Sequence, residues 1–336
     1  MKIKKLKGLE IIIDKEYELI LAFYAVYLSK HPELRKKFDF IETPNIKYVG
    51  ELKKLITIEN YKEIVKYLIN FSDCSAPIVM AVGIENYEVD YEKIQDKEIE
   101  KYMGYGTIEG FSKELKRLAN DINWDNFILN HKPFYEEIVE NVCLFPKDLN
   151  LRDIEEYYSI KPSSYTFIPS VLMNGGFGVS DKKGNLFYNR GFQYNEKKQK
   201  FEVDSEYLAE CLFHEFSHPI VNPLVDKYFL NTQLLEQFYE IAVKNNLHPV
   251  YADNKSTVMY EYLVRANAYI LAKKYFKDIM PAIEDDWIIE YGFTYLPDLV
   301  LFTENSLTSY KNYEQFVREA IPEFMNFCIQ KSNKCI

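Results

Sequence analysis

Apolar positions recur at helical spacing over residues 15–30, the first clear element of the chain. The positions on one face are Leu19, Ala22, Phe23, Val26 and Tyr27. This spacing fits a helix of about 3.6 residues per turn, and Asp14 just before it is a favoured N-cap. Segments rich in Lys, Glu, Leu and Ile predict further helices, and short apolar runs predict strands. The helices are predicted at 48–72, 92–120 and 133–142, and the strands at 8–13 and 77–82.

The pattern changes near residue 150. Strands are predicted at 165–168, 171–179 and 185–192, and the turn sequence Asp181-Lys182-Lys183-Gly184 separates the last two. The segment Val171–Phe192 is therefore the best candidate for a β-hairpin. Helices are predicted from about Ser205 and then at 231–246, 257–276, 283–290 and 311–329. Helices, a small sheet and further helices, in that order, predict an α+β fold rather than alternating βαβ units.

This order of elements predicts three regions. We expect a mostly helical N-terminal region over residues 1–150 and a core over residues 151–300. The core should hold a small mixed sheet and an active-site helix, and residues 301–336 should form a C-terminal helical segment that packs on it. The length of 336 residues fits one large or two modest domains, at about 100–200 residues each.

Composition narrows the class of protein. Hydrophobic residues make up 47% and charged residues 27%, which excludes a disordered chain, a collagen and a coiled-coil rod. The net charge of -10 argues against a nucleic-acid partner, because phosphate binding needs clustered Lys and Arg. The five scattered cysteines form no CxxC, so neither a disulfide framework nor a thiolate zinc site is expected.

No segment of the sequence is suited to crossing a membrane. The apolar stretch Leu19–Leu28 is far shorter than the roughly 20 residues that a spanning helix needs. Acidic residues interrupt the apolar run after the Lys-rich N-terminus, and no small-residue cleavage site follows, so no signal peptide is expected. We predict a cytoplasmic protein, although a chain whose leader had been removed would show the same pattern.

The segment Glu210–His218 contains the motif HExxH. Of the five His in the chain, His214 and His218 lie four residues apart, so on a helix they share one face. Two imidazoles so placed can bind one Zn²⁺ at about 2.0–2.1 Å. Glu215 would then lie beside the metal and could take a proton from metal-bound water. The competing interpretation is a His pair packed in a helix and satisfied by hydrogen bonds.

The residues around the motif bear on both interpretations. Apolar residues lie on nearly every face of the predicted helix, which predicts that it is buried. These residues are Ala209, Cys211, Leu212, Phe213 and Phe216. Burying His and Glu side chains costs free energy because they lose their water, and coordination of a metal would offset this cost. Pro219 directly follows His218, and a residue before Pro is disfavoured in the α conformation. The helix is therefore predicted to end or kink at His218.

A catalytic zinc needs a third protein ligand and an open position. Glu261 is the favoured candidate, because apolar residues border it on the predicted helix 257–276 and Arg265, one turn on, can orient its carboxylate. The alternatives are Glu236, Glu240, His248 and Asp226, the last also as a partner of a ligand. The competing interpretation of Glu261 is an ion pair with Arg265 on a solvated helix face.

HExxH with a downstream Glu resembles the gluzincin clan of zinc metallopeptidases. The strings HEFSHPIVNPLVDKY and YEYLVRA are similar to the HEFxHxxVNP and ExxVRA motifs of an uncharacterised bacterial family of zincin-like proteins, over roughly residues 160–300. The resemblance implies a zincin-like core with zinc ligands at His214, His218 and Glu261 and a general base at Glu215. It also matches Asn222 and Pro223 to the Asn-Pro step, and Arg265 and Ala266 to the Arg-Ala step.

Zincin-like folds place a sheet beside the motif helix, with an edge strand antiparallel to bound peptide. By this likeness, Asn174, Gly175 and Gly176 are the candidate substrate edge, since glycines permit close approach of another backbone. The competing interpretation is an ordinary glycine-bearing bend. An oxyanion donor is also needed. The candidates for that role are Tyr291, Tyr295, Tyr260, His248 and Arg265, while Asn222 and Asp226 are candidates to support the ligands.

These features predict a zinc-dependent peptidase that hydrolyses peptide bonds by metal-activated water, with Glu215 as general base. Its cofactor would be Zn²⁺ and its partner a peptide or protein substrate. The alternative is a catalytically inactive zincin-like protein that binds zinc and peptide. A third hypothesis is a helical protein in which the motif is fortuitous.

Overall fold

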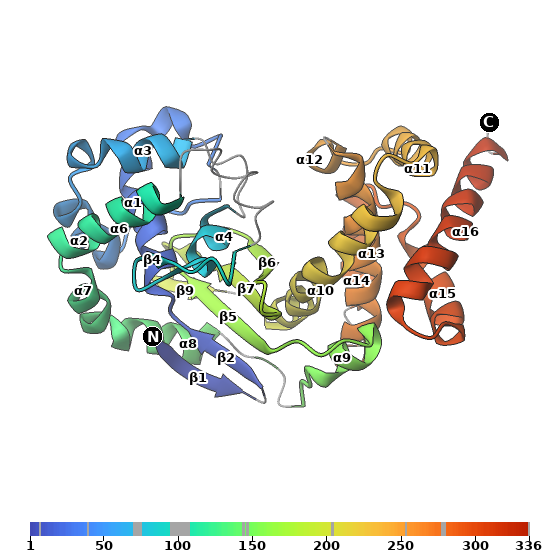
Figure 1. Cartoon of the computed structure of the whole chain (residues 1–336), viewed down its shortest axis with the longest axis horizontal. Coiled ribbons are helices and arrows are strands. Elements are labelled where there is room, and N and C mark those ends of the chain that lie inside the picture. Colours follow the sequence, from blue (N-terminus) through green and yellow to red (C-terminus); the bar gives the residue numbers. More distant parts are fainter. Residues whose placement is uncertain are drawn as a thin grey trace. The chain divides into compact units, whose positions relative to one another are not determined.

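The computed structural model of the chain describes residues 1–6, 8–38, 40–69, 76–94, 108–142, 145, 148–202, 205–252, 254–276 and 280–334. These residues form many helices and a small mixed sheet, so the predicted α+β class is confirmed (Figure 1). The chain divides into two compact units. Unit 1 comprises Met1–Leu144 and Pro162–Ser205, and unit 2 comprises Phe145–Lys161 and Glu206–Ile336. Over these described ranges, no helix is both long and apolar enough to cross a membrane.

Unit 1 is built on a five-stranded sheet with the strand order β1-β2-β5-β7-β6. Its strands are β1 (Lys2–Leu6), β2 (Leu9–Ile12), β5 (Ser164–Ser170), β6 (Gly176–Ser180) and β7 (Asn185–Gly191). β5 runs parallel to both β2 and β7, whereas β1 and β6 pair antiparallel with their neighbours. An N-terminal strand therefore pairs with one from far along the chain, and Leu9 lies opposite Tyr165.

Helix α1 (Lys15–Lys30) is the central helix of unit 1. Asp14 caps it as predicted, because its side chain accepts a hydrogen bond from the Tyr17 amide at 2.9 Å. The helix is buried on nearly every face, including at Glu16 and Glu18. Over its described residues, the other α-helices of the unit are α2 (Lys47–Leu55), α3 (Lys62–Ile69), α4 (Ala76–Val82), α6 (Ile108–Asp121), α7 (Trp124–Asn130) and α8 (Lys132–Val142).

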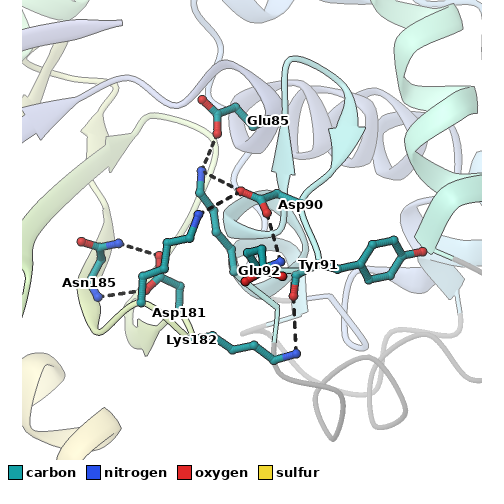
Figure 2. Close-up of polar contacts among 9 residues, drawn as sticks. Glu85, Asp90, Tyr91, Glu92, Asp181, Lys182 and Asn185 are labelled. Carbon is teal, nitrogen blue, oxygen red and sulfur yellow. Dashed lines mark hydrogen bonds and ion pairs between the residues drawn. The ribbon is translucent and has the colours of Figure 1, made fainter.

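Two short ribbons complete unit 1, and one of them contacts the β6–β7 hairpin. They are β3 (Ile84–Glu85) with β4 (Glu88–Val89), and β8 (Gln193–Asn195) with β9 (Lys200–Glu202). Figure 2 shows Asp181, in the hairpin turn, accepting hydrogen bonds from the main-chain and side-chain nitrogens of Asn185 at 2.9 and 2.7 Å. In the same turn, Lys183 Nζ lies 3.4 Å from Asp90 Oδ2, which follows β4. The predicted hairpin is confirmed, and its turn is fixed by side chains.

Two strand predictions differ from the structure. Residues 77–82 are helical and belong to α4, so the predicted strand there is wrong. The strand predicted over 171–179 begins only at Gly176, because the chain bends before it and Gly175 has φ +84°. The helix predicted over 92–120 begins at Ile108 in the described part of the chain, and its residues 95–107 lie outside that part. The single helix predicted over 48–72 is wrong, because α2 and α3 are separate helices with a 3-10 turn at Ile58–Asn60 between them. Its residues 70–72 lie outside the described part of the chain.

The two units do not follow the boundaries predicted near residues 150 and 300. The sheet expected in a core over 151–300 groups with the N-terminal region, because β5 pairs with β2. Residues 145–161, by contrast, group with the helices after Glu206. Pairing between distant strands decides this division, and local composition carries no signal for it.

Unit 2 is helical in its described residues. Its helices are α9 (Arg152–Tyr158), α10 (Ser205–Phe229), α11 (Gln233–Lys244), α12 (Pro249–Ala252), α13 (Lys255–Ala272), α14 (Met280–Ile289), α15 (Leu296–Ser306) and α16 (Tyr313–Lys334). The Thr232 and Asn254 side chains cap α11 and α13 by accepting main-chain hydrogen bonds. α13 packs against α11 and α15, and α16 packs against α11 and α9. This packing fixes α13, which carries Glu261.

Unit 1 buries a carboxyl group without an adjacent cation among the contacts described. Glu18 of α1 is 1% exposed and accepts hydrogen bonds from three hydroxyls: those of Tyr48, Tyr135 and Ser170. Burial raises the pKa of Glu18 to about 7, although the three hydroxyls partly offset that rise. Hydroxyl donors alone do not fully replace the water that this carboxylate loses.

Gly191 at the end of β7 is a position where the fold requires glycine. A Cβ atom there would lie 1.8 Å from the main-chain oxygen of Met173, and a backbone atom cannot move away as a side chain can. We expect Gly191→Ala to lower the free energy of unfolding by about 1–3 kcal/mol. Gly50→Ala in α2 is the matched control, because its Cβ would meet nothing within 4 Å. Denaturant unfolding checks this, and equal stability of the two variants would contradict it.

Candidate metal centre

Helix α10 places both His of the HExxH motif on one face. His214 Nε2 and His218 Nε2 lie 3.1 Å apart, and the residues are buried and partly buried, respectively. Glu215 follows His214 and is 9% exposed. The one-turn spacing predicted from the sequence therefore brings two ring nitrogens together, with a buried carboxyl next along the helix.

Helix α13 brings Glu261 to the same point. Glu261 Oε1 lies 3.5 Å from His218 Nε2, and Glu261 Oε2 lies 3.7 Å from His214 Nε2. Ligand atoms about 2.0–2.1 Å from a tetrahedral zinc are about 3.3–3.4 Å apart. The 3.1 Å between the two rings is close to that length, and so are the 3.5 and 3.7 Å from each ring to its nearer Glu261 oxygen, a different oxygen for each ring. Over the described residues, these three side chains form the one group of His, Cys, Asp or Glu that could hold a metal ion.

The His218 ring is oriented by its other nitrogen. His218 Nδ1 lies 3.2 Å from Asn222 Oδ1, one turn further along α10. An amide oxygen only accepts, so Nδ1 carries the proton in this contact and Nε2 keeps its lone pair. That lone pair is directed towards His214 and Glu261. Asn222, predicted as a supporting residue, thus selects the tautomer of His218 that can bind a cation.

Of the two outcomes predicted at His218, an end or a kink, the structure excludes the end, and the kink stays a prediction. α10 continues to Phe229 with Pro219 and Pro223 inside it. Pro219 offers no N–H to the carbonyl one turn back, but the turn before it is anchored from the side. Ser217 Oγ donates to Phe213 O and accepts from Tyr158 Oη of α9, each at 2.6 Å. Tertiary contacts of this kind override a local preference.

The alternative third ligands lie in other contacts. Glu236 forms an ion pair with Lys255, and Asp226 accepts a hydrogen bond from Tyr260 Oη. His248 Nδ1 accepts from the Val250 amide at 3.2 Å, and Glu240 is exposed on α11. Among these candidates, Glu261 is the one with described contacts to both rings of the His pair, and its role as a ligand stays a prediction.

The candidates for oxyanion donor differ in their surroundings. Tyr295 Oη accepts a hydrogen bond from Asn245 Nδ2 at 2.8 Å, and the Tyr260 hydroxyl donates to Asp226. Tyr291 packs edge-on against Tyr251. Arg265 is on α13, and its Nη2 atom lies 3.1 Å from Glu261 Oε2, as expected for a residue that orients this carboxylate. The oxyanion role stays a prediction for each of them.

The predicted substrate edge lies in unit 1, whereas the His and Glu cluster lies in unit 2. Gly176 opens β6, which is at the edge of the sheet as expected. The backbone of Gly175 adopts a left-handed conformation, and the main-chain N–H of Asn174 donates a hydrogen bond to Phe40 O at 2.7 Å. A Cβ at Gly176 would lie 2.9 Å from the Tyr188 ring, so packing within unit 1 also requires this glycine. Binding of a substrate strand there stays a prediction.

Two neighbours of the cluster were not singled out from the sequence. Glu210 precedes His214 by one turn of α10 and is 2% exposed. Its spacing of four residues from His214 places it on the same face of a helix, and this spacing could have identified it from the sequence. Tyr251 of α12 accepts a hydrogen bond from Arg265 Nη2 at 2.9 Å, and burial raises its pKa to about 12 even though Arg265 acts in the opposite direction. No sequence pattern marked Tyr251.

Comparison with known proteins adds a family. A family model described as "Domain of unknown function (DUF4932)" matches residues 9–326, which covers nearly the whole chain and parts of both units. No curated protein and no solved structure matches the chain.

Proposed function

We propose that this chain, which belongs to the family described as "Domain of unknown function (DUF4932)", is a zinc-dependent peptidase. The observation that carries the proposal is the convergence of His214 Nε2, His218 Nε2 and the Glu261 carboxylate at 3.1–3.7 Å. Two neutral imidazoles and one carboxylate suit Zn²⁺, and three protein ligands are typical of catalytic rather than structural zinc. The resemblance of the motifs to zinc metallopeptidases favours the peptide bond as the target.

Each side chain has a distinct part in the proposed reaction. A zinc ion held by His214, His218 and Glu261 would supply Lewis acidity towards water and a carbonyl oxygen. Glu215 is the proton carrier: its carboxylate takes a proton from the attacking water and delivers it to the nitrogen of the leaving amine. Asn222 holds the His218 ring, as its 3.2 Å contact with Nδ1 indicates.

We further propose that the protein acts on peptides or proteins in the cytoplasm. Cys328 is a buried free thiol, which suits a reducing compartment. Cell fractionation with the native chain tests this, and recovery outside the cytoplasm would overturn it.

Zinc content tests the proposed site directly. We expect the purified protein to bind one zinc ion per chain and His214→Ala to lose it, because the substitution removes one of three donors. The loss of affinity should exceed the roughly 10–100-fold that follows removal of a hydrogen-bond partner of a ligand. His248→Ala is the matched control, since His248 lies in the same unit and outside the cluster. Equal zinc content in His214→Ala and wild type would overturn the site.

A peptide-library assay with and without chelator then separates the two functions that such a site could serve. Cleavage that stops on chelation and returns with zinc supports a peptidase. Zinc binding without any cleavage would favour the alternative, a zincin-like protein that binds zinc and peptide but does not hydrolyse.

A further inference from the structure

Arg265 is buried in a box of aromatic rings beside the candidate metal centre. Its guanidinium carbon lies 4.8–5.5 Å from the centroids of four rings, and the residue is 7% exposed. The rings belong to Tyr251, Trp287, Tyr291 and Phe293. Ring faces attract a guanidinium, and such contacts strengthen when water is excluded. The box therefore fixes the position of the Arg265 charge.

Arg265 lies against one oxygen of Glu261. Arg265 Nη2 lies 3.1 Å from Glu261 Oε2 and donates to Tyr251 Oη at 2.9 Å. The other oxygen, Glu261 Oε1, faces His218 Nε2 at 3.5 Å. Each oxygen of this carboxylate thus faces one ring nitrogen, since Glu261 Oε2 lies 3.7 Å from His214 Nε2, and Oε2 has the Arg265 guanidinium beside it as well.

We propose that Arg265 is a positioning residue that reserves Glu261 Oε2 for itself, so that Glu261 offers only Oε1 to a bound cation. The inference rests on the cation site proposed above. A carboxylate free to turn can bind a metal through both oxygens, and the second oxygen would occupy the position that a catalytic site keeps open. A guanidinium held rigidly by four rings prevents this, and a flexible ammonium would do so less well.

The number of donors around a cobalt ion tests the proposal. Co²⁺ is added to the metal-free full chain, and its visible absorption reports coordination, because four-coordinate Co²⁺ absorbs much more strongly than five-coordinate Co²⁺. We expect wild type to show the intense bands and Arg265→Met to lose most of that intensity, as Glu261 turns to bind through both oxygens. Arg318→Met is the control, because Arg318 pairs with Glu319 on α16 of the same unit and should leave the spectrum unchanged.

Affinity alone does not decide the question. Removing a nearby positive charge strengthens cation binding, whereas loosening a ligand weakens it, and both effects are substantial. Arg265→Lys is the second variant and serves if Arg265→Met does not fold, which near-ultraviolet circular dichroism would show. It keeps the charge but not the planar fork, so we expect a partial loss of band intensity.

The outcomes separate this inference from the proposed function. If wild type binds no Co²⁺, the metal site itself fails and the inference fails with it. If wild type binds Co²⁺ and a folded Arg265→Met or Arg265→Lys variant keeps the wild-type spectrum, the positioning role is overturned while the metal site stands. A weakened spectrum in the Arg265 variants alone supports the inference.

Discussion

Glu215→Gln is expected to keep its zinc and to hydrolyse peptides about 10²–10⁴-fold more slowly than wild type. The amide is close in size to the carboxylate, but it cannot accept the proton from the attacking water. The position is buried and adjoins His214, and the Glu215 side chain is not among the three that converge as candidate ligands. Steady-state kinetics together with elemental analysis of the same samples measures both parts of the expectation.

Glu240→Gln provides the matched control for this experiment. Glu240 is exposed on α11 in the same unit, so its variant should match wild type in zinc content and rate. Turnover retained by Glu215→Gln would remove Glu215 from the mechanism. Loss of zinc in Glu215→Gln would instead make Glu215 part of the metal site rather than a separate proton carrier.

Glu18→Gln is expected to raise the free energy of unfolding above pH 7, by up to roughly 3 kcal/mol. The pKa of Glu18 is about 7 in the folded chain, against 4.5 for an ordinary Glu, because burial disfavours the charged form. A group whose folded pKa is raised stabilises the fold at low pH and loses that contribution as pH rises. Wild type should therefore lose stability from about pH 4.5 to beyond pH 7, and Gln, which does not ionise, should not.

Unfolding midpoints of both proteins between pH 4 and 9 measure this difference. The groups that face Glu18 are Tyr48, Tyr135 and Ser170, and the nearby charge of Asp14 acts in the same direction as burial. Glu16, whose pKa burial also raises to about 7, is present in both proteins and so cancels. Glu109→Gln, at an exposed position of α6, is the control. A stability difference that stays constant across the pH range would contradict the expectation.

Local sequence signals predicted the parts of the site that lie within one helix. The four-residue spacing of His214 and His218 predicts adjacent ring nitrogens, and the structure has them 3.1 Å apart. Glu261 and Arg265 are likewise one turn apart on α13, and their predicted contact is present at 3.1 Å. In each case helix periodicity fixes the geometry, so no knowledge of the fold is needed.

The features that depend on distant parts of the chain were not predictable. The aromatic box around Arg265 draws its rings from α12, α14 and the residues after α14, and in a chain with many aromatics no single ring stands out. The parallel pairing of β2 with β5 assigned the sheet to unit 1, although composition changes near residue 150. Pro219 does not end α10, and a contact from α9 supports the turn that precedes it.

The chain passes between its two units three times, because residues 145–161 visit unit 2 before the sheet of unit 1 is complete. During synthesis on the ribosome, α9 is therefore made well before α10. The hydrogen bond from Tyr158 of α9 to Ser217 can form only after α10 has been made. A fragment cut at Glu206 would carry His214, His218 and Glu261 but not α9. Studies of the candidate metal centre in isolation should thus join residues 145–161 to the C-terminal helices rather than truncate the chain at one point.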